Sequence, residues 1–277
     1  MRPSERLTAV FLAALVVAAM LGRPPSPGIA LELAALAAAT VLLARAAPTS
    51  NAGALLRDFF PIATVVAVFM LLEPVIVGVN PRRWDEYFSG FDARWFPTIV
   101  PAWRNAFGRA PAFTDLVYVA YVSYYALPIL VALLARRRGP AAFEGGVLAI
   151  LLAFYGSFAG YLLFPTAGPR LSPADEARLV GGGAVSDAVR AFLHAAERTR
   201  LDAFPSGHTA IALVSAAVGA RLAPRHAAAL LAWAGAVVFS TVYIHVHYVL
   251  VVVAGAALAV AAVAGAPALG RALGRER

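Results

Sequence analysis

The chain has 277 residues, of which 61% are hydrophobic and only 14% are charged. Soluble domains carry roughly 45–50% apolar and about 25% charged residues, so this composition excludes an ordinary soluble protein and predicts a polytopic membrane protein. The formal net charge of +8 would favour nucleic-acid binding in a soluble chain. Here the arginines gather in short loops between apolar runs, where they set orientation in a membrane. Because the sequence contains no cysteine, disulfides, thiolate nucleophiles and thiolate metal sites are excluded.

Apolar segments recur along the whole chain and predict an all-α bundle of about eight transmembrane helices. The first segment, Leu7 to Leu21, reaches only about 22 Å as a helix, against roughly 30 Å for the bilayer core. Since Arg2 and Arg6 precede it, a signal sequence is the alternative, but a second segment follows at once and favours a retained anchor. The segments cover residues 7–21, 29–43, 60–79, 113–135, 145–164, 210–222, 227–244 and 248–264.

The chain offers no separate soluble domain, so we expect a single membrane unit with two parts. Residues 1–58 hold two N-terminal spans and a polar loop, and residues 59–277 hold the larger membrane domain. An even number of spans places both termini on one side, together with the arginine-rich loops. The positive-inside rule makes that side cytoplasmic, in a bacterial-type inner or plasma membrane. The long loop of residues 171–203, with a short amphipathic helix near residues 187–198, is then extracytoplasmic.

Residues 80–112 are too polar to span a membrane but hold three of the four tryptophans. Aromatic side chains recur there at steps of four, three and four residues, which places them on one face of a helix. They are Trp84, Phe88, Phe91 and Trp95. Asp85 and Asp92 are expected to point away from that face. Such a stripe usually anchors a helix in the membrane interface, and a lid over a lipid headgroup is the alternative.

The fourth apolar segment, residues 113–135, is rich in tyrosine. The spacing of Tyr118, Tyr121 and Tyr125 predicts that the three rings share one helical face. Packing between helices explains such a stripe, and the alternative is a polar cavity lined by the hydroxyl groups.

The stretch from Phe204 to Thr209 combines a turn, a helix start and an imidazole. Ser206 is a favoured N-cap, and Gly207 has no side chain to block the free amides of the first helical turn. Together with the helix dipole, these amides predict an anion site beside His208, with phosphate as its natural occupant. The alternative is a capped membrane helix with one interfacial histidine.

Two further residues are expected at the same membrane face as His208. Two prolines and a glycine end the fifth segment and direct Arg170, whose planar guanidinium suits phosphate. His247 lies at the junction of the last two segments. A neutral imidazole can attack phosphorus while a second histidine protonates the leaving alcohol, so no metal and no cofactor is required. His245 and His247 would lie roughly 200° apart on a helix, which argues against a two-histidine metal pair.

These motifs resemble the type 2 phosphatidic acid phosphatase (PAP2) superfamily, whose second motif is PSGH and whose third is SRxxxxxHxxxD. Pro205 to His208 matches the second motif in full. The third motif falls on Ser240, Thr241, His247 and Val251, and two of these four depart from it. The Gly168 to Arg170 exit, the missing third-motif arginine and the His247-Tyr248 pair are more similar to the inositol phosphorylceramide synthase branch. The resemblance extends from Phe113 to about Gly255 and, more weakly, over the aromatic stretch before it.

The resemblance implies a six-helix core and a role for each matched residue. Arg170 and the amides of Ser206 and Gly207 would bind phosphate, His208 would protonate the leaving group, and His247 would be the nucleophile. The family's aspartate orients that nucleophile, but Val251 stands in its place. Either this chain is impaired or another acceptor substitutes, for which Asp202 is the candidate.

The expected function is therefore an integral-membrane lipid phosphotransferase. It moves a phosphoryl group or phospho-headgroup from a phospholipid or lipid phosphate, through a phosphohistidine, to a lipid alcohol or polyol. One alternative is a phosphatase acting on phosphatidate or polyprenyl phosphate, with water as the acceptor. Another is a non-catalytic member that binds lipid phosphates, which Val251 favours. A transporter unrelated to phosphate would need a repeated pattern in the two halves of the chain, and the sequence has none.

Overall fold

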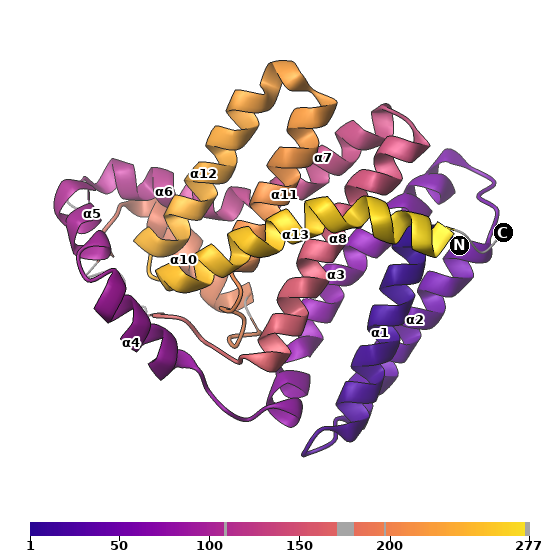
Figure 1. Ribbon diagram of the computed structural model, residues 1–277, viewed down its shortest axis with the longest axis horizontal. Helices are drawn as coiled ribbons and strands as arrows, with labels where there is room; N and C mark the ends of the chain where they lie inside the picture. The colour runs from indigo at the N-terminus through magenta and orange to yellow at the C-terminus, as the bar shows by residue number, and fades with distance from the viewer. Residues whose placement is uncertain (108–109, 171–179, 197, 275–277) are drawn as a thin grey trace.

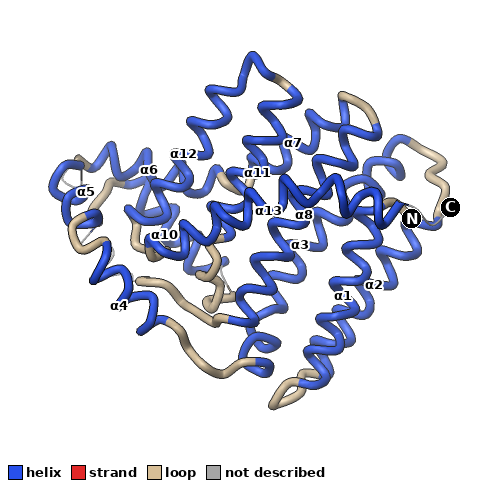
Figure 2. The backbone as a smooth tube through the Cα atoms, in the orientation of Figure 1, coloured by secondary structure: helices blue, strands red, loops and turns tan. Residues whose placement is uncertain are grey.

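The structure is a computed structural model that describes residues 1–107, 110–170, 180–196 and 198–274. Within these ranges the chain is built from helices and connecting loops, and the tube in Figure 2 shows no strand. The all-α prediction is therefore confirmed. Part of the predicted outer loop, residues 171–179, lies outside the described residues, and the remainder of that loop contains the expected short amphipathic helix.

Most of the helices follow one another through short connections (Figure 1). In chain order they are α1 (Pro3–Leu21), α2 (Pro27–Arg45), α3 (Asn51–Val79), α4 (Asp85–Trp95), α5 (Ile99–Phe107), α6 (Pro111–Ser123), α7 (Ala126–Arg137), α8 (Pro140–Leu163), α10 (Ala184–Ala196), α11 (Gly207–Leu222), the 3-10 turn η1 (Pro224–His226), α12 (Ala227–Tyr243) and α13 (Val249–Gly274).

All eight predicted segments are helical, but they do not cross in the same way. Six helices in the described ranges are long and apolar enough to span a membrane: α1, α2, α3, α8, α12 with η1, and α13. The fourth predicted span is broken into α6 and α7, which bend by 48°. Pro128 explains the break between α6 and α7, because a proline ring clashes with the carbonyl four residues earlier, here that of Tyr124, and so disfavours a continuous helix. The sixth predicted span, α11, has only 16 residues.

The start of α1 and the end of α13 lie at the same end of the bundle, where Figure 1 marks both termini. The Arg6 guanidinium donates a hydrogen bond of 2.7 Å to the Leu273 carbonyl. We call this the arginine end, since Arg2, Arg57 and Arg136 also lie here, joined to carboxylates of neighbouring helices. The opposite end, called the site end, holds the loops 164–170, 203–206 and 244–248.

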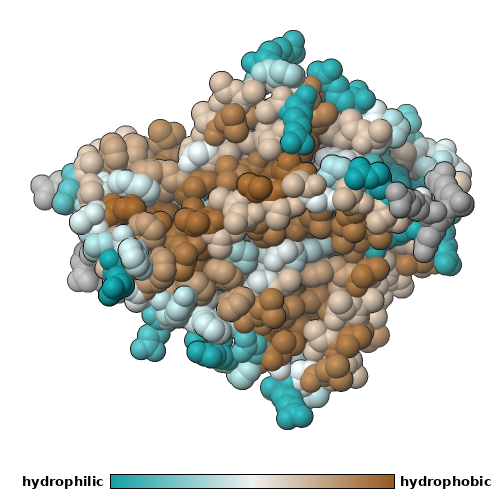
Figure 3. Space-filling view, viewed as in Figure 1, coloured by the Kyte–Doolittle hydropathy of each residue, from teal (hydrophilic) through white to brown (hydrophobic). Residues whose placement is uncertain are grey.

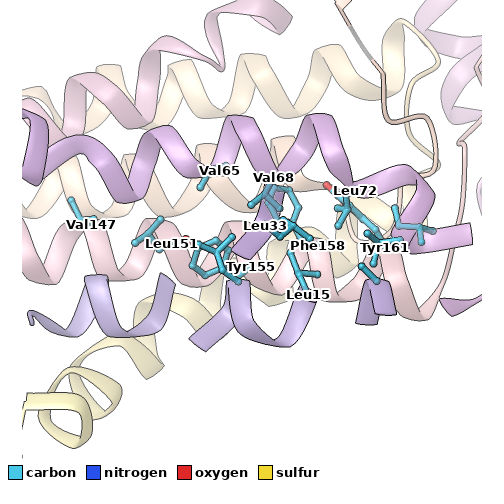
Figure 4. Close-up of a cluster of buried hydrophobic side chains, with 14 of the residues drawn as sticks. Leu15, Leu33, Val65, Val68, Leu72, Val147, Leu151, Tyr155, Phe158 and Tyr161 are labelled. Atoms are coloured by element: carbon cyan, nitrogen blue, oxygen red, sulfur yellow. The ribbon is translucent and has the colours of Figure 1, made fainter. Parts of the chain in front are cut away.

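Among the described residues, the helices are held together by three buried apolar clusters. The smallest joins α6, α10 and α12, and the two larger ones share α7 and α8. One of the larger clusters joins α1, α2, α3, α7 and α8, and Figure 4 shows Leu15, Leu33, Val68, Leu151 and Phe158 meeting within it. The other joins α7, α8, α11, α12 and α13. In a membrane such contacts stabilise through close van der Waals packing, because lipid is as apolar as the side chains. The division at residue 58 stays a prediction, and that residue lies within α3.

Large apolar side chains also cover the outside of the bundle. Leu31 on α2 is 72% exposed and Val260 on α13 is 70% exposed. In Figure 3 hydrophobic residues form a broad band across the molecule, and hydrophilic residues gather towards its edges. A surface of this extent is suited to lipid rather than water, so the chain is an integral membrane protein.

Candidate active site

The start of α11 has the predicted N-cap, but one of the amides expected to bind phosphate is hydrogen-bonded within the protein. The Ser206 hydroxyl accepts a hydrogen bond of 3.2 Å from the Thr209 amide, as an N-cap should. The Ser206 amide, expected to contact phosphate, donates at 3.0 Å to the carbonyl of Val251 on α13. A Cβ on Gly207 would lie 2.5 Å from the Tyr161 hydroxyl, so a larger residue would require the Tyr161 side chain to move. The first turn of α11 is thus tightly enclosed by α8 and α13.

The two candidate histidines meet at this turn. His208 is in the first turn of α11, and His247 lies in the loop between α12 and α13. The Nε2 atom of His247 is 3.4 Å from the Nδ1 atom of His208, although 39 residues separate them. Their rings meet edge to face, with centroids 5.5 Å apart. The structure therefore brings together the expected proton donor, His208, and the expected nucleophile, His247.

His208 is enclosed by two tyrosines from the break between α6 and α7. Tyr121 stacks on the imidazole at 4.6 Å between centroids, and Tyr124 lies at 4.3 Å. The predicted face of Tyr118, Tyr121 and Tyr125 is wrong at its last member, because Tyr125 is 46% exposed. The bend turns Tyr125 outward and brings Tyr124, which the sequence analysis had not selected, onto the histidine.

Arg170 lies beside the histidines and is paired with a carboxylate. Its Nη2 atom donates to Asp202 at 2.6 Å, and the Asp202 side chain is only 7% exposed. The two segments also meet through the backbone, where the Ala203 amide donates to the Thr166 carbonyl at 2.9 Å. Asp202, the expected substitute for the missing aspartate, thus positions Arg170.

Gly168 allows the loop that carries Arg170 to approach the loop that carries His247. Its φ is +82°, a conformation that favours glycine. A Cβ at this position would lie 2.2 Å from the Val246 carbonyl oxygen. No other residue fits at this contact without moving one of the two loops.

His247 is buried and held in its neutral form. Burial, above all, lowers the pKa of His247 well below its ordinary value of 6.5, and the nearby His208 and Arg170 lower it further. The backbone of Ala203 acts in the opposite direction. Among the described residues, Nδ1 of His247 has no hydrogen-bond partner of ordinary geometry. A neutral, partly unsatisfied imidazole is suited to nucleophilic attack.

Val251 and Thr241, the two departures from the third motif, are both fully buried. Val251 lies in the first turn of α13, about one helical turn after His247, so a hydrocarbon side chain stands where the resemblance implies an orienting carboxylate. The Thr241 hydroxyl donates to the Val238 carbonyl at 2.8 Å, and the Thr241 carbonyl accepts the amides of Val246 and His247. Thr241 therefore shapes the loop of His247 but adds no positive charge.

The aspartates of α4 were expected to point away from the aromatic face of that helix, and the structure shows that both contact neighbouring loops of the protein. Asp85 accepts hydrogen bonds from the amides of Ala167 and Gly168, at 2.9 and 3.0 Å. Asp92 accepts hydrogen bonds from the first amides of α13. Trp95, expected in the same aromatic stripe as Phe88, is 61% exposed, whereas Phe88 is buried. Aromatic spacing found the helix, but both of its faces carry aromatic residues, so spacing did not reveal which face meets the protein.

Comparison with known proteins assigns this arrangement to a family. A family model described as the PAP2 superfamily matches residues 86–265, which include Arg170, His208 and His247. The chain belongs to the PAP2 superfamily. No curated protein and no solved structure matches it. Membership in the PAP2 superfamily indicates a phosphatase- or phosphotransferase-type enzyme that acts on lipid phosphates in a membrane.

Proposed function

We propose that this PAP2 superfamily member is a lipid phosphotransferase that forms a phosphohistidine on His247. The observation that carries the proposal is the contact of the two imidazoles, with Nε2 of His247 3.4 Å from Nδ1 of His208. Arg170 lies close enough to lower the pKa of His247. A phosphate that replaces the direct contact of the rings would meet a nucleophile, an acid and a cation together.

The reaction is a double displacement. Nε2 of His247 attacks phosphorus, and the bond from phosphorus to the diacylglycerol oxygen breaks. His208 donates a proton to that oxygen, since an anionic phosphate beside it favours the imidazolium form. The acceptor alcohol then loses its proton to His208 and attacks the phosphohistidine, which restores both histidines. Arg170 holds the phosphate oxygens throughout.

The low positive charge of the site favours a phosphodiester donor. Arg170 is already paired with Asp202, and Thr241 stands where the phosphatases of the family carry an arginine. A phosphodiester has one negative charge, whereas a phosphate monoester approaches two near neutral pH. This balance supports transfer of a phospho-headgroup, as in the inositol phosphorylceramide synthase-like branch, over hydrolysis of phosphatidate.

Aromatic rings around His208 support an alcohol as acceptor. Tyr121 and Tyr124 cover the imidazole, and Phe88 stacks on Phe204 with centroids 4.8 Å apart, close to the turn that carries His208. An apolar enclosure excludes water from a reactive intermediate, so a lipid alcohol or polyol competes for the phosphohistidine.

The charge distribution supports an extracytoplasmic site. The short connections at the end of the bundle opposite to His208 and His247 carry Arg136, Arg137, Arg138, Arg221 and Arg225. The positive-inside rule, which counts the arginines of short loops, assigns that side to the cytoplasm. The substrate then reaches the enzyme from the outer leaflet of a bacterial-type inner membrane.

One observation favours a different outcome. Val251 is fully buried where the family has its orienting aspartate, and the group that favours the protonated His247 ring is the Ala203 backbone rather than a carboxylate. The second candidate is therefore an impaired member that binds lipid phosphates without turning them over.

The test uses the detergent-purified protein in mixed micelles with phosphatidylinositol or phosphatidate, each labelled in its phosphate. Transfer predicts an acid-labile, base-stable protein label that His247→Ala lacks, and labelled lipid products that appear only when a lipid alcohol is added. Release of inorganic phosphate from phosphatidate, whatever alcohol is present, would instead identify a phosphatase. Saturable binding of either lipid without label or product would identify the non-catalytic member.

A further inference from the structure

The α4 helix contacts all three loops of the site end from a single face. Asp85 accepts the amides of Ala167 and Gly168, in the loop that leads to Arg170. Phe88 stacks on Phe204, directly before the PSGH turn. Asp92 accepts the amides that follow His247 and Tyr248. Figure 1 shows α4 along the outer edge of the bundle.

The spacing of these three residues fits one helical face. Positions 85, 88 and 92 fall within an arc of about 60° on an α-helix of 100° per residue. The residues between them are oriented outward, as the exposed Glu86 and the 57% exposed Tyr87 show. The face therefore carries two acceptors separated by an aromatic ring, and each acceptor meets a different loop.

The hydrogen bonds of Asp92 are placed where a helix needs acceptors. Val249 is the first residue of α13, and the amides of Val249 and Leu250 donate to the Asp92 carboxylate at 2.6 and 3.1 Å. First-turn amides have no partner within their own helix, and the positive end of the dipole favours a carboxylate. The position of α13, and with it that of His247 two residues before, is therefore tied to α4.

Asp85 makes the equivalent attachment at the other loop. Its Oδ1 atom accepts two consecutive amides, and the Trp84 amide next to it donates to the Pro165 carbonyl at 3.0 Å. A loop that contains the left-handed Gly168 is thereby held by three hydrogen bonds to the start of α4. Arg170 follows this loop directly.

We propose that α4 is a splint that sets the distances among Arg170, His208 and His247, with Asp85 and Asp92 as positioning residues. Asp85 holds the loop of Arg170 and therefore affects substrate binding. Asp92 holds the start of α13 and therefore affects the position of the nucleophile, His247. The kinetic part of this proposal rests on the proposed function, whereas the structural part does not.

The kinetic test compares Asp92→Ala, Asp92→Asn and Asp85→Ala with Glu86→Ala, an exposed acid of the same helix, on phosphatidylinositol in mixed micelles. Asp92→Ala should lower kcat about 10- to 100-fold with little change in KM, because it displaces the nucleophile. Asp85→Ala should mainly raise KM. Asp92→Asn keeps one acceptor oxygen and should recover part of kcat, while Glu86→Ala should match the parent. Identical losses in all four variants, or none in the aspartate variants, would overturn the proposal.

The structural test needs no turnover. Amide hydrogen exchange of the full chain should speed up within residues 247–251 in Asp92→Ala, and within residues 165–170 in Asp85→Ala, with the arginine end unchanged. Unchanged exchange in these segments would overturn the splint whatever the activity. Faster exchange in a protein with no activity on any lipid phosphate would refute the proposed function and leave the splint standing.

Discussion

The two ends of the helical bundle both bury polar side chains, but they satisfy them differently. At the arginine end, Glu5 is nearly buried and accepts a hydrogen bond of 2.8 Å from Arg57. Asp58 is shared between Arg2 at 2.8 Å and Arg136 at 2.7 Å. These ion pairs connect α1, α3 and α7, and they leave the carboxylates of this end with oppositely charged neighbours.

At the site end Arg170 pairs with Asp202, but other buried polar atoms lack such neighbours. Within the described residues, Nε2 of His208 and the hydroxyl of Thr209 make no hydrogen bond. Buried polar atoms are nearly always paired, because leaving one unpaired costs about 1–3 kcal/mol. The comparison teaches that the arginine end is completed by the chain itself, whereas the site end is arranged for a ligand.

The largest difference between the ends should appear in the histidines. His247→Ala and His208→Ala should each lower turnover by at least about 10⁴-fold, because each removes a reacting group. His226→Ala, an exposed histidine of the arginine end, is the matched control and should retain full activity. A chelator should have no effect on the parent protein. Activity lost with chelator and regained with a divalent ion would contradict a metal-free phosphohistidine route.

Restoring the family carboxylate at position 251 should raise activity at the site end. Val251→Asp should raise turnover by about two orders of magnitude or more, since losing such an orienting group costs about 10⁴ in the serine-protease example. Substrate affinity should change little, because the carboxylate stabilises the cationic histidine as the reaction proceeds. Steady-state kinetics on phosphatidylinositol and phosphatidate measure both values. A folded variant that is no faster on either lipid would mean that another group already orients His247.

Two glycines with positive φ allow the ends to be compared directly. Gly168→Ala should lower turnover about 100-fold, because its Cβ would push the Arg170 loop from Val246 and misplace the reacting groups. Gly139 at the arginine end has a φ of +109° but open space around it. Gly139→Ala should therefore strain the backbone without changing turnover. Equal kinetic losses in both variants would show that the effect is general destabilisation.

An ion-pair variant should produce the opposite pattern. Glu5→Gln should lower the free energy of unfolding by about 1–3 kcal/mol, since it leaves Arg57 without its charged partner in a partly buried position. Turnover per folded molecule should stay within about twofold of the parent, a change too small to mark a transition-state interaction. Thermal unfolding and kinetics on the same sample separate these effects. A large loss of turnover in the folded variant would contradict this prediction, because it would show that the arginine end contributes to catalysis.

The smallest expected effect concerns pH. Burial, with His208 and Arg170, holds the pKa of His247 well below 6.5, so the nucleophile stays neutral as the pH falls through that value. A depressed pKa keeps the active, uncharged form available at lower pH, and kcat/KM should lose activity through His247 only below pH 6.5. A profile of kcat/KM against pH tests this. An acid limb above pH 6.5 that disappears in a His247 variant with residual activity would contradict it.

The sequence determined the features that depend on local chemistry. Composition and apolar segments indicated an all-α membrane bundle, the Ser206 cap follows from residues within its own turn, and helix counting placed His208 and His247 at one end. The break before Pro128 had a local signal too, but the length and apolar character of residues 113–135 outweighed it in the prediction.

Tertiary structure decided which groups meet. Asp202 pairs with Arg170, the Ser206 amide donates to Val251, and Asp92 caps a helix 157 residues further along the chain. The spacing of the aromatic residues identified the faces of α4. Apolar side chains pack equally well against lipid and against protein, so a periodic pattern in a membrane protein does not reveal which face is buried in the protein. Only the folded chain showed that the acidic face of α4 supplies the acceptors that buried amides require.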